Sequence, residues 1–109
     1  MDEFVQACRA MAAQFNRCST DHGFWDINTS DGEKIALMHS ELSEALEALR
    51  HDDPPDDKLP EFRGSEVELA DCVIRILDFG HQRGLRIAEA CVAKHAYNLG
   101  RPFLHGKKF

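Results

Sequence analysis

The chain has 109 residues, 43% of them hydrophobic, and a formal net charge of −6 at pH 7. This length allows one domain, placed at residues 1–109, with a modest core that oligomerisation would help to stabilise. Residues 41–71 carry 11 acidic and 3 basic side chains, a net −8, whereas residues 72–109 carry 2 acidic and 7 basic side chains, a net +5. A nucleic-acid polymer requires a broad basic face, so this distribution excludes that partner and favours cations with a small anionic ligand.

The chain shows no sign of a targeting or membrane segment. It begins MDEF, without a basic start or an apolar run, and no stretch approaches the ~20 apolar residues of a membrane span. The four cysteines, Cys8, Cys18, Cys72 and Cys91, form no CxxC pair, and all except Cys18 lie in apolar helical context. We therefore expect a cytoplasmic protein with no membrane partner and with reduced, buried thiols.

The first helix is predicted at residues 2–18, where apolar side chains recur on one face. That face consists of Phe4, Ala7 or Cys8, Met11, Ala12 and Phe15. Residues 19–31 are rich in Ser, Thr, Asp, Asn and Gly, which is typical of a loop. Trp25 lies in this loop and has two interpretations: it anchors the loop on the core, or it flanks the flat ring of a ligand.

The central helix is predicted at residues 33–50, EKIALMHSELSEALEALR, whose apolar stripe has spacings of three and four. The stripe consists of Ile35, Met38, Leu42, Ala45 and Leu49. Ser30 and Glu33 have the spacing of a capping box, which predicts that the helix begins at Ser30. Glu41 and Glu44 are neighbours on the helix surface, and Glu41 borders the apolar stripe. A carboxylate in that position is costly to desolvate unless a cation meets it.

Two further helices are predicted after an acidic, Pro-rich connection at residues 51–64, which should be solvated and let the chain reverse. The third helix runs from Ser65 to about residue 83, and the fourth covers residues 85–99. The fourth helix is expected to turn inward Ile87, Ala88, Cys91, Val92, His95 and Leu99. The predicted fold is all-α: a small bundle of about four helices, completed by oligomerisation.

The third helix repeats the acid pair of the central helix, with Glu68 and Asp71 beside its apolar stripe. Two structural interpretations stay open, because Glu68 has capping-box spacing to Ser65 and Asp71 can pair with Arg75. The functional hypothesis is that the two helices face each other and pool their acids around a divalent metal. Oxygen ligands without a Glu-x-x-His motif favour Mg²⁺, with Mn²⁺ as a substitute, over zinc or a di-iron centre.

The pattern Glu41-Leu-Ser-Glu44, a gap, then Glu68-Leu-Ala-Asp71 resembles the ExxE…ExxD signature of the MazG-like, all-α nucleoside triphosphate pyrophosphohydrolases. The resemblance extends to the C-terminal KHAYNLGRPFLHGKKF and covers most of residues 23–109. It implies a homodimer or homotetramer that hydrolyses a nucleoside triphosphate between the α and β phosphates. The products would be a monophosphate and pyrophosphate, and the role would be nucleotide-pool house-cleaning.

The resemblance also implies roles for single residues. Glu41, Glu44, Glu68 and Asp71 match the metal ligands, and Glu41 and Glu44 are assigned to catalysis. Lys94, Asn98 and Arg101 match positions that meet phosphate or sugar, and Trp25 is assigned to the base pocket. Ser40 stands where some relatives carry a Glu that serves as general base, so a metal-bound hydroxide or one of the four acids would take that role.

Two other functions remain open at this level. The acids can be the solvated faces of a non-catalytic helical module that binds a protein partner. Alternatively, the chain is a different metal-dependent phosphohydrolase that acts on a diphosphate. Mg²⁺ and nucleotide would stabilise either enzyme by mass action, and the reaction products would separate the two enzymes.

Overall fold

The computed structural model describes residues 1–108, which contain four α-helices and no β-strand. The helices are α1 (Asp2–Asp21), α2 (Asp31–Arg50), α3 (Gly64–Arg83) and α4 (Ile87–Leu99), and a short 3₁₀ helix follows at Phe103–Gly106. The prediction of an all-α fold with about four helices is confirmed. Phe109, the last residue of the predicted domain and of the C-terminal resemblance, lies outside the described residues.

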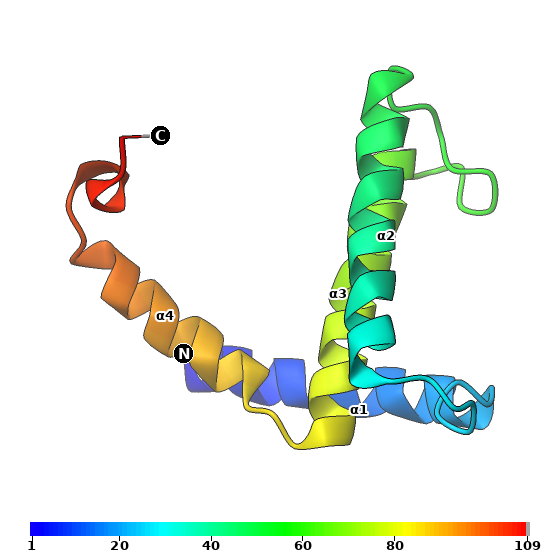
Figure 1. Ribbon diagram of the computed structural model, residues 1–109, viewed down its shortest axis with the longest axis horizontal. Coiled ribbons are helices and arrows are strands. Elements are labelled where there is room, and N and C mark those ends of the chain that lie inside the picture. Colours follow the sequence, from blue (N-terminus) through cyan, green and yellow to red (C-terminus); the bar gives the residue numbers. More distant parts are fainter. Residues whose placement is uncertain (109) are drawn as a thin grey trace.

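The fold is organised around a hairpin of two long antiparallel helices, α2 and α3 (Figure 1). The Pro-rich connection reverses the chain at one end of this hairpin, as the sequence predicts, and α1 crosses it at the other end. α3 packs against both α2 and α1, whereas α4 contacts α1. From there α4 runs away from the hairpin, so the monomer is open rather than a closed bundle.

Capping interactions set the start of both hairpin helices. The predicted capping box of α2 is present, because Glu33 N donates to Ser30 Oγ at 3.1 Å and Ser30 N donates to the Glu33 carboxylate. α3 begins one residue earlier than expected, at Gly64, and Glu66 accepts a hydrogen bond from Arg63 N at 3.0 Å. The capping interpretation of Glu68 is therefore wrong, and its carboxylate is available to face α2.

Ser65 has a different role from the predicted cap. Its backbone N donates to Asp53 Oδ1 at 2.8 Å, and its hydroxyl donates to Asp53 Oδ2 at 2.5 Å. These hydrogen bonds hold the pKa of Asp53 below its usual value. They also tie the Pro-rich connection to the start of α3, which fixes the register of the hairpin beside the acid pairs.

The core consists of small side chains. Its buried apolar residues are Ala12, Ala45, Cys72 and Ala88, one from each helix, and no large side chain of the described chain is fully buried. Small residues let the helices approach closely. Gly80 shows this most clearly, because a Cβ atom there would lie 2.6 Å from Ile87 Cγ1. Helix α4 can therefore begin against α3 only because position 80 has no side chain.

The predicted inward face of α4 is only partly confirmed in the single chain. Ala88 is buried and Ile87 and Val92 are half-buried, but Cys91 and His95 are exposed and Leu99 is 75% exposed. The physical reason is that α4 contacts α1 near its start and then projects into solvent. The buried thiols are confirmed only at Cys72; all four cysteines are free.

None of the helices in residues 1–108 combines the length and the apolar character needed to cross a membrane.

Candidate metal centre

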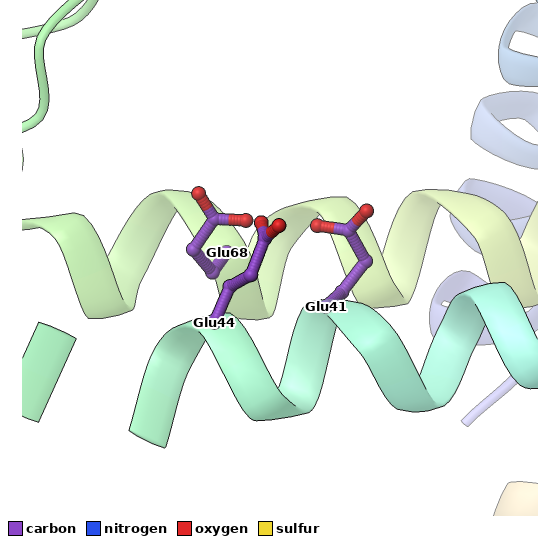
Figure 2. A group of neighbouring side chains, drawn as sticks. All are labelled: Glu41, Glu44 and Glu68. Atoms are coloured by element: carbon purple, nitrogen blue, oxygen red, sulfur yellow. The ribbon is translucent and has the colours of Figure 1, made fainter. Parts of the chain in front are cut away.

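Three glutamates from the two hairpin helices converge on one point. Glu41 and Glu44 of α2 and Glu68 of α3 each offer a carboxylate oxygen, and these oxygens lie within 4.8 Å of one another. Figure 2 shows the three side chains pointing toward each other across the α2–α3 contact. Glu41 is buried, Glu68 is half-buried and Glu44 is exposed, so the cluster opens to solvent on one side. We refer to these three residues as the acidic cluster.

The electrostatics of the acidic cluster are unfavourable without a cation. Burial, hydrogen bonding to Glu41 and Glu44, and the charges of both raise the pKa of Glu68 from 4.5 to about 8. Burial and the charge of Glu41 also raise the pKa of Asp71. Near neutral pH the acidic cluster therefore holds a proton, which a divalent ion would displace. Its three carboxylates are the kind of oxygen donor that a hard cation prefers.

Asp71 is less directly placed than the other predicted ligands. It is half-buried, feels the charges of Glu41 and Glu44, and lines the neighbouring groove. The structure thus brings three of the four predicted ligands into one group and leaves the fourth beside it.

The positively charged side chain of Arg75 is paired with the acidic cluster. The predicted pair with Asp71 within α3 is replaced by an ion pair across the hairpin, in which Arg75 Nε donates to Glu41 Oε1 at 3.1 Å. The Glu41 side chain is 10% exposed, and Arg75 is 37% exposed. Glu41 can be buried because Arg75 partly neutralises it.

An aromatic groove of about 600 Å³ lies next to the acidic cluster, between α1, the following loop and the hairpin. Its apolar lining comes mainly from Phe15, Phe24, Trp25, Ile27, Leu37, Met38, Ile74 and Phe79. Its polar lining includes Lys34, Asp71, Arg75 and Asp78. Asp71 and Arg75, which line this groove, also interact with the acidic cluster, so the groove and the cluster are neighbours.

Trp25 is held in the groove by its indole N–H. Nε1 donates to Asp78 Oδ1 and to Ser19 Oγ, each at 3.0 Å, and Asn16 donates to the same Asp78 oxygen at 2.9 Å. Lys34 Nζ lies 4.4 Å from the centre of the indole ring. The anchoring interpretation of Trp25 is confirmed, and its position in the groove leaves the ligand interpretation open.

The three residues predicted to meet phosphate or sugar lie elsewhere in the chain. Lys94 and Asn98 are on α4, and Arg101 follows it, on the part that runs away from the hairpin (Figure 1). Lys94 Nζ lies 4.7 Å from the ring centre of Tyr97, and Arg101 lies 5.5 Å from it. Asn98 Oδ1 is buried and has no hydrogen-bond partner among the described residues. One copy of the chain does not bring these residues to the acidic cluster.

Ser40 does not replace the missing glutamate as a base. Its hydroxyl donates to Leu37 O, one turn earlier in the same helix, at 2.6 Å. A neutral serine hydroxyl is also too weak a base to take a proton from water, whichever hydrogen bond it donates.

The groove residues Asp78, Lys34 and Arg75 were not among the predicted site residues. A signal for two of them was present, because Glu68, Asp71, Arg75 and Asp78 recur at spacings of 3, 4 and 3 on one side of the third helix. That spacing does not reveal their partners, which come from other helices. Lys34 carried no comparable signal.

Comparison of the chain with protein-family models, with curated proteins and with solved structures found no match.

Proposed function

We propose that this chain is a Mg²⁺-dependent nucleoside triphosphate pyrophosphohydrolase of the MazG-like type. The observation that carries the proposal is the acidic cluster, in which three glutamates from two antiparallel helices converge beside a groove large enough for a nucleoside. The chemistry proposed is hydrolysis of a ribo- or deoxyribonucleoside triphosphate to the monophosphate and pyrophosphate, and nucleotide-pool house-cleaning is the proposed role.

The acidic cluster fits a hard divalent cation. All three donors are carboxylates, and the raised pKa of Glu68 reflects charge that a cation would compensate. Glu41, Glu44 and Glu68 would hold Mg²⁺, with Asp71 completing the set and Mn²⁺ as a substitute. A bound divalent cation supplies neutralisation of the phosphate oxygens and lowers the pKa of bound water.

The reaction requires a water oxygen to attack the α- or the β-phosphorus while the bond from that phosphorus to the α–β bridging oxygen breaks. The water proton needs an acceptor and the bridging oxygen needs charge stabilisation. Of the residues assigned to catalysis, Glu44 is the better acceptor, because it is exposed and Glu41 is paired with Arg75. The aromatic groove would receive the nucleoside, with the ring of Trp25 in its wall.

A second copy of the chain is the proposed source of the missing phosphate contacts. The accessible surface is 8363 Å² for a 12.3 kDa chain, whereas a compact monomer of this mass exposes about 6100 Å². The excess of about 2300 Å² exceeds the roughly 800 Å² that each partner buries in a standard interface. A homodimer or homotetramer would cover it and could bring Lys94, Asn98 and Arg101 of one copy toward the acidic cluster of another.

The surface that a second copy would cover includes one side of the hairpin. Leu42 and Leu46 each follow a buried residue of α2, and Leu69 and Val73 each follow a residue of α3 that faces α2. Because the helices are antiparallel, both rows turn to the same side of the hairpin. All four side chains are 46–53% exposed. This apolar side is absent from the lining of the groove, so association through it leaves the groove accessible.

The proposal is tested by incubating the protein with Mg²⁺ and each of the common nucleoside triphosphates, and separating the products by chromatography. Monophosphate and pyrophosphate are expected. Diphosphate and orthophosphate would indicate the alternative phosphohydrolase, and no product with any nucleotide would favour the non-catalytic module. Glu44→Gln should abolish turnover, while Glu61→Gln, an exposed residue of the Pro-rich connection, should retain it.

A further inference from the structure

Arg75 lies at the junction of the acidic cluster and the aromatic groove. Its Nε donates to Glu41 Oε1 at 3.1 Å, and the same side chain lines the groove together with Asp71 and Met38. Arg75 is the basic residue that the structure pairs with the acidic cluster within residues 1–108. Arg75 is therefore close both to where the proposed cation would bind and to where the proposed phosphate groups would bind.

The guanidinium of Arg75 has hydrogen-bond donors that the described part of the chain does not use. Within the described part of the chain its one hydrogen bond uses Nε, so both terminal nitrogens remain available. A guanidinium presents five N–H donors in a planar fork and binds phosphate oxygens in pairs. At 37% exposed, the side chain also has room to change rotamer, whereas Glu41 is held at 10% exposure.

A divalent cation at the acidic cluster would compete with Arg75 for the carboxylate of Glu41. Arginine keeps its proton at all accessible pH values, so it cannot relieve repulsion from an incoming cation by deprotonation. Repulsion from the cation therefore favours displacement of the guanidinium, and the groove that it already lines offers space for it.

We propose that Arg75 is an internal counter-ion that holds Glu41 until a divalent cation enters the acidic cluster, and that it then positions a phosphate group of the ligand in the groove. The inference rests on the proposed function, because it adds a residue to that site. It makes two separable claims: Arg75 competes with the cation, and Arg75 contacts the phosphates.

The first claim is tested with Mg²⁺ alone, by isothermal titration calorimetry on the full chain without nucleotide. Arg75→Gln should bind Mg²⁺ about tenfold more tightly than the unmodified protein, because a competing positive charge is removed. Arg17→Gln removes the same charge from an exposed position of α1 and should change the affinity by less than about twofold, because solvent screens a distant charge. Equal or weaker binding by Arg75→Gln, or binding by neither protein, overturns the counter-ion claim.

The second claim is tested by steady-state kinetics at saturating Mg²⁺. Arg75→Gln should raise KM for the nucleotide about tenfold or more, with a smaller fall in kcat, because a paired phosphate contact is lost. Arg75→Lys keeps the charge without the fork, so its Mg²⁺ affinity should stay within about twofold of the unmodified protein while KM takes an intermediate value. An unchanged KM in both variants overturns the phosphate claim.

These outcomes separate the inference from the proposed function. If the protein hydrolyses nucleotides while both Arg75 variants behave as the unmodified protein does, the inference fails and the function stands. If no nucleotide is hydrolysed but Arg75→Gln binds Mg²⁺ more tightly, the function fails and the counter-ion claim stands. Should Arg75→Gln fail to fold, the comparison of Arg75→Lys with Arg17→Gln still decides the phosphate claim.

Discussion

Replacing Glu68 by Gln should stabilise the protein in the absence of metal, and more strongly at high pH. The neighbouring carboxylates and burial raise the pKa of Glu68 from 4.5 to about 8. Between these two pH values the folded state binds more protons than the unfolded chain, so the free energy of unfolding falls as pH rises. A glutamine of similar shape has no proton to lose, so this loss disappears in the variant.

The size of the effect follows from the two pKa values. The difference between 4.5 and about 8 corresponds to about 5 kcal/mol when it is fully expressed. The carboxyls titrate together, and the exposed Glu44 can rotate away into solvent, so we expect about 2–3 kcal/mol at pH 8.5. For a domain of this size, that change raises Tm by about 10 °C or more, while at pH 5 the two proteins should melt within a few degrees of each other.

The assay is thermal and urea unfolding of Glu68→Gln and the unmodified protein between pH 5 and 8.5, in EDTA. Ionisable groups that the substitution does not touch contribute to both proteins and cancel in the difference. Glu61→Gln controls for the removal of one negative charge at an exposed position. A stability difference between Glu68→Gln and the unmodified protein that does not change with pH would show that the three carboxylates are not held together, and the candidate metal centre would lose its basis.

Three further predictions follow from the structure. Mg²⁺ at millimolar concentration should raise the Tm of the unmodified protein but not of Glu68→Gln. The rise should be larger at pH 8 than at pH 6, because the ion displaces a proton. The same rise in both proteins would exclude the acidic cluster as the Mg²⁺ site. Gly80→Ala should destabilise the protein by about 1–3 kcal/mol in urea unfolding, because its Cβ would lie 2.6 Å from Ile87 Cγ1. As a control, the Cβ of Gly32→Ala would meet only Ser30 Oγ, at 3.7 Å. That variant should be neutral or should stabilise the protein by up to about 1 kcal/mol. Leu46→Glu should shift the protein toward monomer in sedimentation equilibrium without loss of helical circular dichroism; an unchanged mass would place the interface elsewhere.

Helix positions were largely predictable from the sequence because they depend on local spacing. The capping box at Ser30 and the prolines after Arg50 set the bounds of α2 within a residue. The start of α3 was missed because two overlapping patterns competed, and the one that uses Glu66 is formed rather than the one that uses Glu68. The backbone N–H of Ser65 is instead bound by Asp53 of the preceding connection, a contact that the local spacing does not reveal.

Three of the four acids predicted as ligands form the acidic cluster, whereas its charge balance was not predictable. Spacing placed Glu41 and Glu44 on one helix and Glu68 on the next, and the Pro-rich reversal brings the two helices together. The partner of Arg75 was predicted within its own helix, where Asp71 is four residues away. The structure pairs Arg75 with Glu41 instead, whose side chain is the more buried of the two.

The sequence by itself determined that this chain is helical, that two of its helices carry paired acids, and that a reversal lies between them. These properties depend on residues three or four apart, or on a few prolines, and short-range geometry decides them. Only the tertiary structure decided that α4 leaves the hairpin, that an aromatic groove adjoins the acidic cluster, and that Arg75 links the two. Those outcomes depend on which helix faces meet in space, and the local pattern of a helix does not encode its neighbour.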